Sequence, residues 1–159
     1  MKKISMLLGA VLLSIGGMLY AVEYGGERTY LSEIPYKVCP VAPLPKEAKE
    51  KGIIIASIDK AVTLYKEGAF FYDARRKAHY DEGHIKGAKP VLFDVSKASY
   101  TVLDLPKDDK TPLVFYCYGV TCANSYEAAL AVKEYGYKNV YWFSVGYAAW
   151  QEKNQPTER

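Results

Sequence analysis

The sequence predicts an α/β fold: a small three-layer domain in which helices flank a mostly parallel central sheet. From Gly52 onward, short β-branched and aromatic runs alternate with segments of helical character, a pattern typical of βαβ units. The length of 159 residues fits one domain with a modest tail. Hydrophobic residues make up 50% of the chain and charged residues 25%, as in a folded protein rather than a disordered one.

The first part of the alternating region is predicted to form two strands around one helix. A β-branched run at 53–55 indicates the first strand. Ser57 is a favourable N-cap for a helix over 58–67, because its hydroxyl can accept a hydrogen bond from a first-turn amide. The aromatic run at 70–72 predicts a buried strand that ends at Asp73.

The second part continues with three predicted strands and two predicted helices. The strands cover 91–93, 112–116 and 139–143, and the helices cover 125–135 and 147–151. Gly136 suits the end of the longer helix, because glycine readily takes the left-handed conformation that closes a helix. The strand at 112–116 leads directly to Cys117, so the end of this strand is a candidate position for chemistry.

The N-terminus is predicted to be a signal peptide over residues 1–21. Lys2 and Lys3 precede an apolar stretch that runs to Leu19, and Ala21 offers a small residue at the expected cleavage position. We therefore expect an exported protein of a bacterial periplasm. An uncut membrane anchor is the alternative, because the apolar stretch approaches the length of a short transmembrane helix. Contact with a membrane is expected only in that case.

The charge balance argues against binding to nucleic acid. The whole chain has a formal net charge of +3, from 21 Lys+Arg and 18 Asp+Glu. Cleavage after Ala21 removes two lysines and no acidic residue, so the mature charge is expected to be +1. Since nucleic-acid binding needs Lys and Arg clustered on one face, we expect no nucleic-acid partner.

Residues 22–51 are predicted to be an extended, proline-rich lead-in to the domain. Four prolines fall in this segment, and each fixes φ and removes a backbone donor, which disfavours regular helix and central strand. The segment either wraps around the core or is a flexible linker. It contains Cys39, the odd third cysteine, either a free thiol or a bridge to the core. Beyond it we expect the domain at 52–152 and a polar C-terminal tail at 153–159.

Cys117 is the leading candidate for a catalytic residue. Open α/β sheets bind ligands at the carboxyl ends of their strands, and Cys117 follows such a strand. Asn124 is predicted to cap the next helix, with Glu127 completing a capping box. The loop amides and the helix N-terminus would then lower the pKa of Cys117 and bind an anion. The alternative is that Cys117 is a buried, unreactive core residue, as free cysteines often are.

Two groups of motifs resemble those of rhodanese-like sulfurtransferase domains. The segments 72–75 (YDAR) and 80–88 (YDEGHIKGA) resemble the first signature of that family. Cys117, the helix that follows it, and the segments 136–141 and 146–150 resemble the second half. The motifs stand in the order and at the spacing of the family, over about the length of one such domain.

The resemblance implies a sulfur-transferring enzyme similar to thiosulfate sulfurtransferase. Cys117 would attack the outer sulfur of a small sulfur anion, thiosulfate or polysulfide, and hold it as a persulfide until a thiol or a protein acceptor removes it. No cofactor and no metal are implied. The implied substrate-binding loop comprises Tyr118, Gly119, Val120, Thr121, Cys122, Ala123 and Asn124, and the residues implied to support the site are Asp73, Arg75 and His84.

The loop departs from the family pattern in three ways. Asn124 stands where the family has an arginine, the loop is longer than usual, and Cys122 lies inside it. The missing positive charge and the greater length are expected to weaken thiosulfate binding and to suit a larger substrate.

Cys122 leaves further interpretations open. In an oxidising compartment, a disulfide between Cys117 and Cys122 would favour thiol–disulfide exchange, or Cys122 would release sulfide from a persulfide on Cys117. Alternatively the domain is a non-catalytic binding module, because a fold alone does not establish a function. A metal site at Cys117, Cys122 and His84 is disfavoured, since a closed zinc site needs four ligands.

Overall fold

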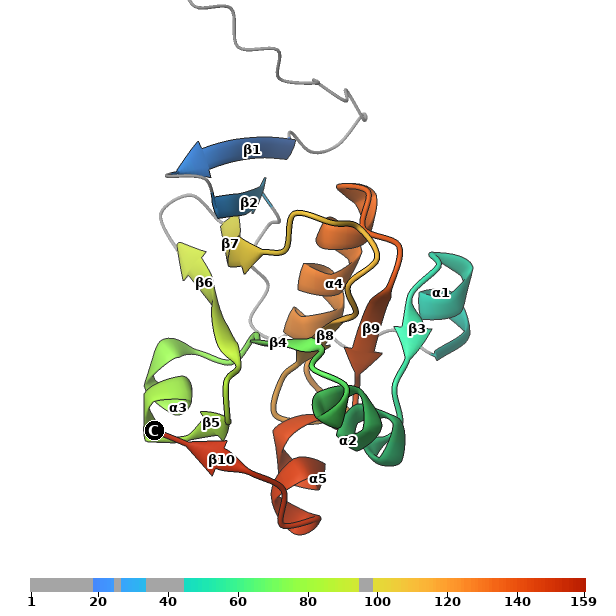
Figure 1. Ribbon diagram of the computed structural model, residues 1–159, viewed down its shortest axis with the longest axis vertical. Coiled ribbons are helices and arrows are strands. Elements are labelled where there is room, and N and C mark those ends of the chain that lie inside the picture. Colours follow the sequence, from blue (N-terminus) through green and yellow to red (C-terminus); the bar gives the residue numbers. More distant parts are fainter. Residues whose placement is uncertain (1–18, 25–26, 34–44, 95–98) are drawn as a thin grey trace, which may run out of the picture.

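The computed structural model describes residues 19–24, 27–33, 45–94 and 99–159. Within them the chain forms an eight-stranded sheet, a two-stranded sheet and five helices (Figure 1). The strands of the large sheet are β1 (Leu19–Tyr24), β2 (Glu27–Glu33), β3 (Ile54–Ile55), β4 (Phe70–Asp73), β6 (Lys89–Asp94), β7 (Ser99–Leu105), β8 (Leu113–Tyr116) and β9 (Val140–Phe143). The small sheet pairs β5 (His84–Ile85) with β10 (Thr157–Glu158). The helices are α1 (Pro45–Glu50), α2 (Ile58–Lys66), α3 (Lys77–Glu82), α4 (Asn124–Glu134) and α5 (Gly146–Glu152).

The centre of the large sheet is parallel. Strands β6, β4, β8, β9 and β3 lie side by side in this order, and each neighbouring pair is parallel. Parallel strands of one sheet need crossover connections; α2 lies on the connection from β3 to β4, and α4 lies on the connection from β8 to its neighbour β9. The predicted α/β class with a mostly parallel central sheet is confirmed.

Helices cover both faces of this parallel sheet. Successive residues of a strand point to opposite faces, so each strand contributes side chains to two separate clusters. Tyr72 and Phe115 belong to one buried cluster, whereas their neighbours Phe71 and Val114 belong to the other. The first cluster includes buried residues of α1 and α4, and the second includes buried residues of α2 and α5. The predicted three-layer arrangement is therefore present.

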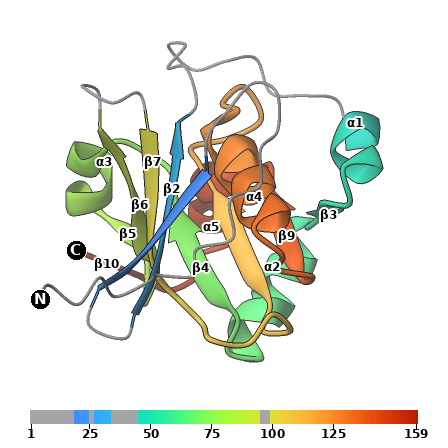
Figure 2. The same ribbon diagram turned by 90° about the horizontal axis from the view of Figure 1, so that it is seen from above.

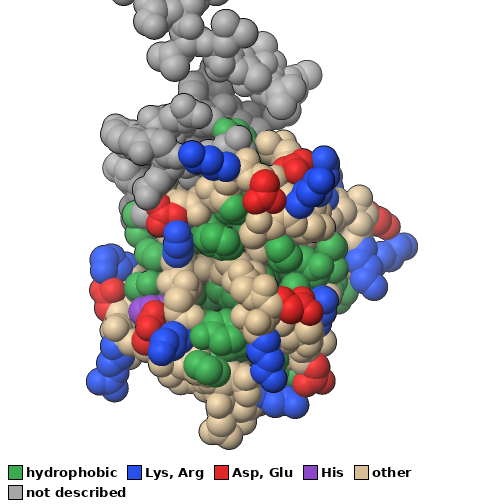
Figure 3. Space-filling model, viewed as in Figure 1, with side chains coloured by type: hydrophobic (Ala, Val, Ile, Leu, Met, Phe, Trp, Pro, Cys, Tyr) green, Lys and Arg blue, Asp and Glu red, His purple; other side chains and the backbone are tan. Residues whose placement is uncertain are grey.

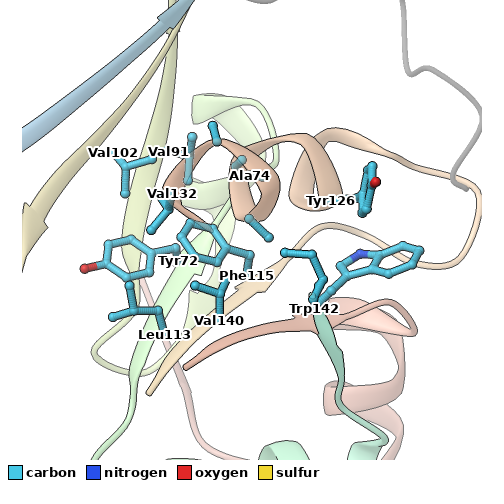
Figure 4. Packing of buried hydrophobic residues seen from close by; sticks show 14 of the residues in the cluster. Tyr72, Ala74, Val91, Val102, Leu113, Phe115, Tyr126, Val132, Val140 and Trp142 are labelled. Atoms are coloured by element: carbon cyan, nitrogen blue, oxygen red, sulfur yellow. The ribbon is translucent and has the colours of Figure 1, made fainter. Parts of the chain in front are cut away.

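The first cluster also anchors the start of α4, as Figure 4 shows from close by. The rings of Tyr72 and Phe115 are stacked with centroids 4.9 Å apart. Trp142 meets Tyr126 edge-on at 5.4 Å, and its indole Nε1 donates a hydrogen bond to Ser125 Oγ at 3.1 Å. Because Ser125 and Trp142 are both buried, this bond satisfies two polar groups that water does not reach.

An antiparallel extension widens the sheet beyond the prediction. β7 pairs with β6, β2 with β7 and β1 with β2, all antiparallel, and Figure 2 shows β7 and β2 beside β6. β2 lies within the segment where the prolines were expected to disfavour strands. Its residues precede all four prolines, so it keeps every backbone donor. β7 was not predicted, although its sequence contains residues that favour strands, among them Tyr100, Thr101 and Val102.

The helix α1 corrects the expectation that residues 22–51 contain no helix. Pro45 is the first residue of α1, a position where the missing N–H has no partner within the helix and the fixed φ is already suitable. The predicted cap of α2 is confirmed, since the Ser57 hydroxyl accepts from the backbone N–H of Lys60 at 3.2 Å. Cys39 lies outside the described residues.

The two chain ends contribute strands. The expected cleavage position after Ala21 falls inside β1, and the signal peptide itself remains a prediction. In the predicted C-terminal tail, the carbonyl of Pro156 accepts from Trp150 Nε1 at 2.9 Å, and Glu158 Oε1 accepts from the N–H of Gly87 at 2.8 Å. Within the described part of the chain, no helix has the length and apolar character that a membrane crossing needs.

Candidate active site

Cys117 lies at the carboxyl end of β8, directly beside the end of β4. The two strands are parallel neighbours in the middle of the sheet, with Tyr116 in register with Asp73. The N–H of Ala74 donates to the carbonyl of Tyr116 at 2.8 Å, which keeps the two segments together where they leave the sheet. The Cys117 side chain is buried at this edge, with the residue 4% exposed.

A second thiol contacts Cys117. Its Sγ donates to Cys122 Sγ at 2.7 Å, and both residues are free, buried cysteines. The loop turns back on itself to bring them together, because the N–H of Cys122 donates to the carbonyl of Gly119 at 3.2 Å. The two cysteines that the sequence placed in one loop therefore form a compact pair.

The start of α5 holds the other side of the loop. The N–H of Tyr147 donates to the carbonyl of Cys117 at 2.9 Å, and the N–H of Ala148 donates to that of Tyr118 at 3.1 Å. Gly146 makes this approach possible: its φ is +60°, and an added Cβ would meet the Cys117 carbonyl and lie 2.9 Å from the Tyr118 carbonyl carbon. Sequence reasoning assigned residues 146–150 to the family pattern but did not place them against the catalytic loop.

The environment of Cys117 corrects the expected direction of its pKa. The hydrogen bond to Cys122 and the burial of the thiol raise the pKa of Cys117 well above its ordinary value, and the charge of Asp73 acts in the same direction. A hydrogen bond from the Tyr118 backbone lowers it by less. The sequence predicted a lowered pKa because it counted backbone amides but not the adjacent sulfur or the loss of water.

The start of α4 also differs from the prediction. Asn124 is the first residue of the helix, and the N-cap is Ala123, which has no side chain to cap it. The predicted capping box of Asn124 and Glu127 is therefore wrong. The start of the helix is held from the core instead, by the buried hydrogen bond between Ser125 and Trp142.

Two exposed apolar side chains border the cysteine pair. Tyr118 is 64% exposed and Val120 is 62% exposed, although Cys117 and Cys122 on either side of them are buried. Thr121 is exposed as well. We call the exposed residues Tyr118, Val120 and Thr121 the rim of the loop; the rim carries no charge, and the two cysteines that flank it in the chain are buried.

Asp73 and Arg75 form a closed ion pair at the end of β4. Both are buried. Arg75 Nε donates to both Asp73 carboxylate oxygens at 3.0 Å, Nη2 donates to Oδ2 at 2.6 Å, and the backbone N–H of Arg75 donates to Oδ1 at 2.9 Å. The guanidinium also bonds the carbonyl of Gly83 at 2.6 Å and lies 3.9 Å from the centre of the Tyr147 ring. These contacts suit the structural role predicted for the pair.

His84 is held in a similarly closed environment. Its Nδ1 bonds the carbonyl of Tyr80 at 2.9 Å, and the two rings stack with centroids 3.7 Å apart. Its Nε2 lies 3.5 Å from Glu158 Oε1. Its contacts therefore suit the predicted supporting role rather than that of a base. Among the residues that the structure describes, no group of three or more His, Cys, Asp or Glu is placed to hold a metal ion.

A sequence model of the Rhodanese-like domain matches residues 57–153, more than half of the chain. The chain belongs to the rhodanese-like domain family. This confirms the resemblance seen in the motifs at 72–75 and 80–88. Among proteins with curated descriptions, none matches the chain.

Solved structures with the same fold are only distantly related in sequence. A Bacillus halodurans protein is 18% identical, with a TM-score of 0.53 over 71% of this chain and 82% of its own. A Rhodopseudomonas palustris protein of unknown function, described as a possible tyrosine phosphatase, is 21% identical, with a TM-score of 0.53 over 79% and 99%. The polysulfide-sulfur transferase homodimer of Wolinella succinogenes is 21% identical, with a TM-score of 0.51 over 71% and 85%. These likenesses establish the fold of this rhodanese-like domain.

Proposed function

We propose that this rhodanese-like protein is a sulfurtransferase that carries a sulfane sulfur on Cys117. The observation that supports the proposal is the position of Cys117, at the carboxyl end of the central strand β8 and at the start of the loop that leads into α4. The likeness to a polysulfide-sulfur transferase favours the same kind of chemistry. The donor is a polysulfide rather than thiosulfate, because Asn124 leaves the loop without a fixed positive charge for a compact dianion.

The transfer has two steps. The Cys117 thiolate attacks the terminal sulfur of the polysulfide, a new S–S bond forms to Cys117 Sγ, and the shortened chain leaves with the electron pair of the broken bond. An acceptor thiolate then attacks the outer sulfur and releases the Cys117 thiolate. The first step requires loss of the Cys117 proton, which the hydrogen bond to Cys122 Sγ and the burial of the thiol oppose.

Intact-mass measurement tests this proposal. Every protein carries Cys39→Ser, so that the count of reactive thiols concerns the loop alone. After exposure to inorganic polysulfide, the Cys122→Ser variant is expected to gain about 32 Da per sulfur bound as a persulfide, and the Cys117→Ser variant is expected to gain nothing. Equal sulfur uptake by Cys117→Ser, or no uptake by any protein that retains Cys117, would contradict the proposal.

Thiol–disulfide exchange is a second candidate, favoured by the 2.7 Å distance between Cys117 Sγ and Cys122 Sγ. It predicts that an oxidised small-molecule disulfide converts the parent protein to a bridged form about 2 Da lighter. Either single Cys→Ser substitution then leaves a mixed disulfide. A binding module without turnover would show neither this bridge nor the persulfide.

Export to a periplasm is part of the same proposal. It is supported by the basic start, the apolar stretch and the small residue at Ala21. Expression of the full chain in a bacterium, followed by fractionation and N-terminal sequencing, is expected to give a periplasmic protein that begins at Val22. A product that keeps Met1 and pellets with membranes would indicate an anchor instead.

A further inference from the structure

Sulfur transfer through Cys117 alone gives Cys122 no role, yet the loop is built to hold it against Cys117. The turn from Gly119 to Cys122 and the two hydrogen bonds from α5 fix the loop at three places. Both cysteines are buried, with the residues 4% and 7% exposed. A thiol from solution must reach these buried sulfurs, whereas Cys122 Sγ is already in contact with Cys117 Sγ.

We propose that Cys122 is a second catalytic residue, which attacks the persulfide on Cys117 and releases its outer sulfur as hydrogensulfide. This inference rests on the proposed function, because it requires that a persulfide forms on Cys117. It turns the domain from a sulfur carrier into one that reduces sulfane sulfur, with an external dithiol as the final reductant.

The step balances as an internal displacement. The Cys122 thiolate attacks the inner sulfur, Cys117 Sγ, and an S–S bond forms between the two cysteines. The bond from Cys117 Sγ to the outer sulfur breaks, and that sulfur leaves with the bonding pair and takes up the proton that Cys122 gave up, as HS⁻. The sulfane sulfur gains two electrons, and the two cysteines lose them as they become a disulfide. A dithiol of the reductant then restores both thiols by exchange and is itself oxidised.

Position favours this internal step over transfer to an outside acceptor. The attacked atom is Cys117 Sγ itself, and in the resting loop it is 2.7 Å from Cys122 Sγ. An intramolecular nucleophile held at contact competes well with dilute thiols in solution, because effective molarities of oriented groups are large.

Single-turnover mass spectrometry tests the inference. Reduced full-length proteins carrying Cys39→Ser are mixed with one equivalent of inorganic polysulfide and quenched by alkylation at intervals. The parent is expected to end about 2 Da lighter, as the disulfide, and to release one more equivalent of sulfide than Cys122→Ser. In Cys122→Ser the adduct of about 32 Da is expected to last at least about tenfold longer than in the parent. Cys122→Ala repeats the measurement, so the result does not depend on how serine fits the buried site.

A matched control keeps the number of thiols constant. The double variant Val120→Cys, Cys122→Ser moves the second thiol to the exposed rim, and its adduct is expected to persist as in Cys122→Ser. Equally fast release by this variant would overturn the inference, because the position of Cys122 would then not matter. A parent adduct as durable as that of Cys122→Ser would overturn it too, while leaving the proposed function intact. Absence of an adduct in both Cys122 variants, with no sulfide from the parent, would reject the proposed function itself.

Discussion

The ends of β4 and β8 lie next to each other in the sheet, yet each carries a different kind of pair. At the end of β4, Asp73 and Arg75 are opposite charges joined by several hydrogen bonds. At the end of β8, Cys117 and Cys122 are neutral thiols that share one hydrogen bond. Both pairs are buried. The first pair has its bonding capacity used within the protein, while the second keeps its reactive atoms for a ligand.

This difference follows from the cost of removing each group from water. A buried carboxylate or guanidinium is stable only when its charge and hydrogen bonds are met by partners, which leaves the Asp73–Arg75 pair no freedom to react. A thiol is buried at little cost while it stays neutral. Cys117 and Cys122 can therefore stay buried as two neutral thiols. On the face of the molecule that Figure 3 shows, Lys and Arg side chains are interspersed with Asp and Glu.

The largest expected effect is the loss of the ion pair at the end of β4. Arg75→Ala leaves the Asp73 carboxylate buried without its main partner, and the free energy of unfolding is expected to fall by about 3–5 kcal/mol. Urea denaturation followed by circular dichroism measures this. Lys77→Ala is the matched control, because its ion pair with Asp81 is exposed and should contribute under about 1 kcal/mol. Similar losses in the two variants would show that the buried Asp73–Arg75 pair contributes no more to stability than the exposed pair does.

A smaller loss is expected from Gly146→Ala, which damages the Cys117–Cys122 end directly. The new Cβ would collide with the backbone of Cys117 and Tyr118 at a φ of +60°, and the cost is expected to be about 2–3 kcal/mol. Sulfur uptake by Cys117 should fall with it, because the loop must move. Gly68→Ala has a similar φ of +82° and nothing within 4 Å of its Cβ, so it isolates the conformational cost at about 1 kcal/mol. If Gly146→Ala takes up sulfur as well as the parent does, the loop has not moved, and the expected collision with the backbone of Cys117 and Tyr118 is contradicted.

The ends of β4 and β8 also show which features can be predicted from the sequence. The resemblance of the motif at 72–75 to the family pattern was sufficient to imply that Asp73 and Arg75 support the site, and their mutual hydrogen bonds suit that role. The parallel sheet and its helices followed from the alternation of apolar runs with helical segments. Such predictions depend on residues that are close together in the chain, and these can be read directly from the sequence.

The Cys117 loop could be located but not described from sequence. Its contact with Gly146 and its sulfur pair depend on segments that meet only after folding. The raised pKa of Cys117 depends on burial, which the local pattern does not report. The hairpin of β1 and β2 was missed because its residues were assigned to the signal peptide and to the proline-rich lead-in, and β7 was missed although Tyr100 and Val102 favour a strand.

Tyr147 contacts residues at the ends of both β4 and β8, and replacement of its ring is expected to have a modest effect on stability. Its ring lies over the Arg75 guanidinium, while its backbone N–H bonds the carbonyl of Cys117. Tyr147→Leu keeps the backbone bond but loses the ring, so the free energy of unfolding should fall by about 1–2 kcal/mol. Tyr147→Phe keeps the ring and should stay within about 0.5 kcal/mol of the parent. If Phe costs as much as Leu, the hydroxyl rather than the ring face is the important group.

The smallest effect on stability and the clearest one on chemistry are expected from Cys122→Ala, which should stay within about 1 kcal/mol of the parent. The hydrogen bond to Cys122 is the largest cause of the raised pKa of Cys117, so its loss is expected to lower that pKa. At any fixed pH below it, a larger fraction of Cys117 is then thiolate, and the pH profile of alkylation by iodoacetamide should shift to lower pH. Rates at the Cys117 peptide, measured by mass spectrometry with Cys39→Ser present, report this shift, and Thr121→Ala at the exposed rim should leave the profile unchanged. A profile that stays in place in Cys122→Ala would mean that burial and Asp73, rather than the second thiol, control the proton on Cys117.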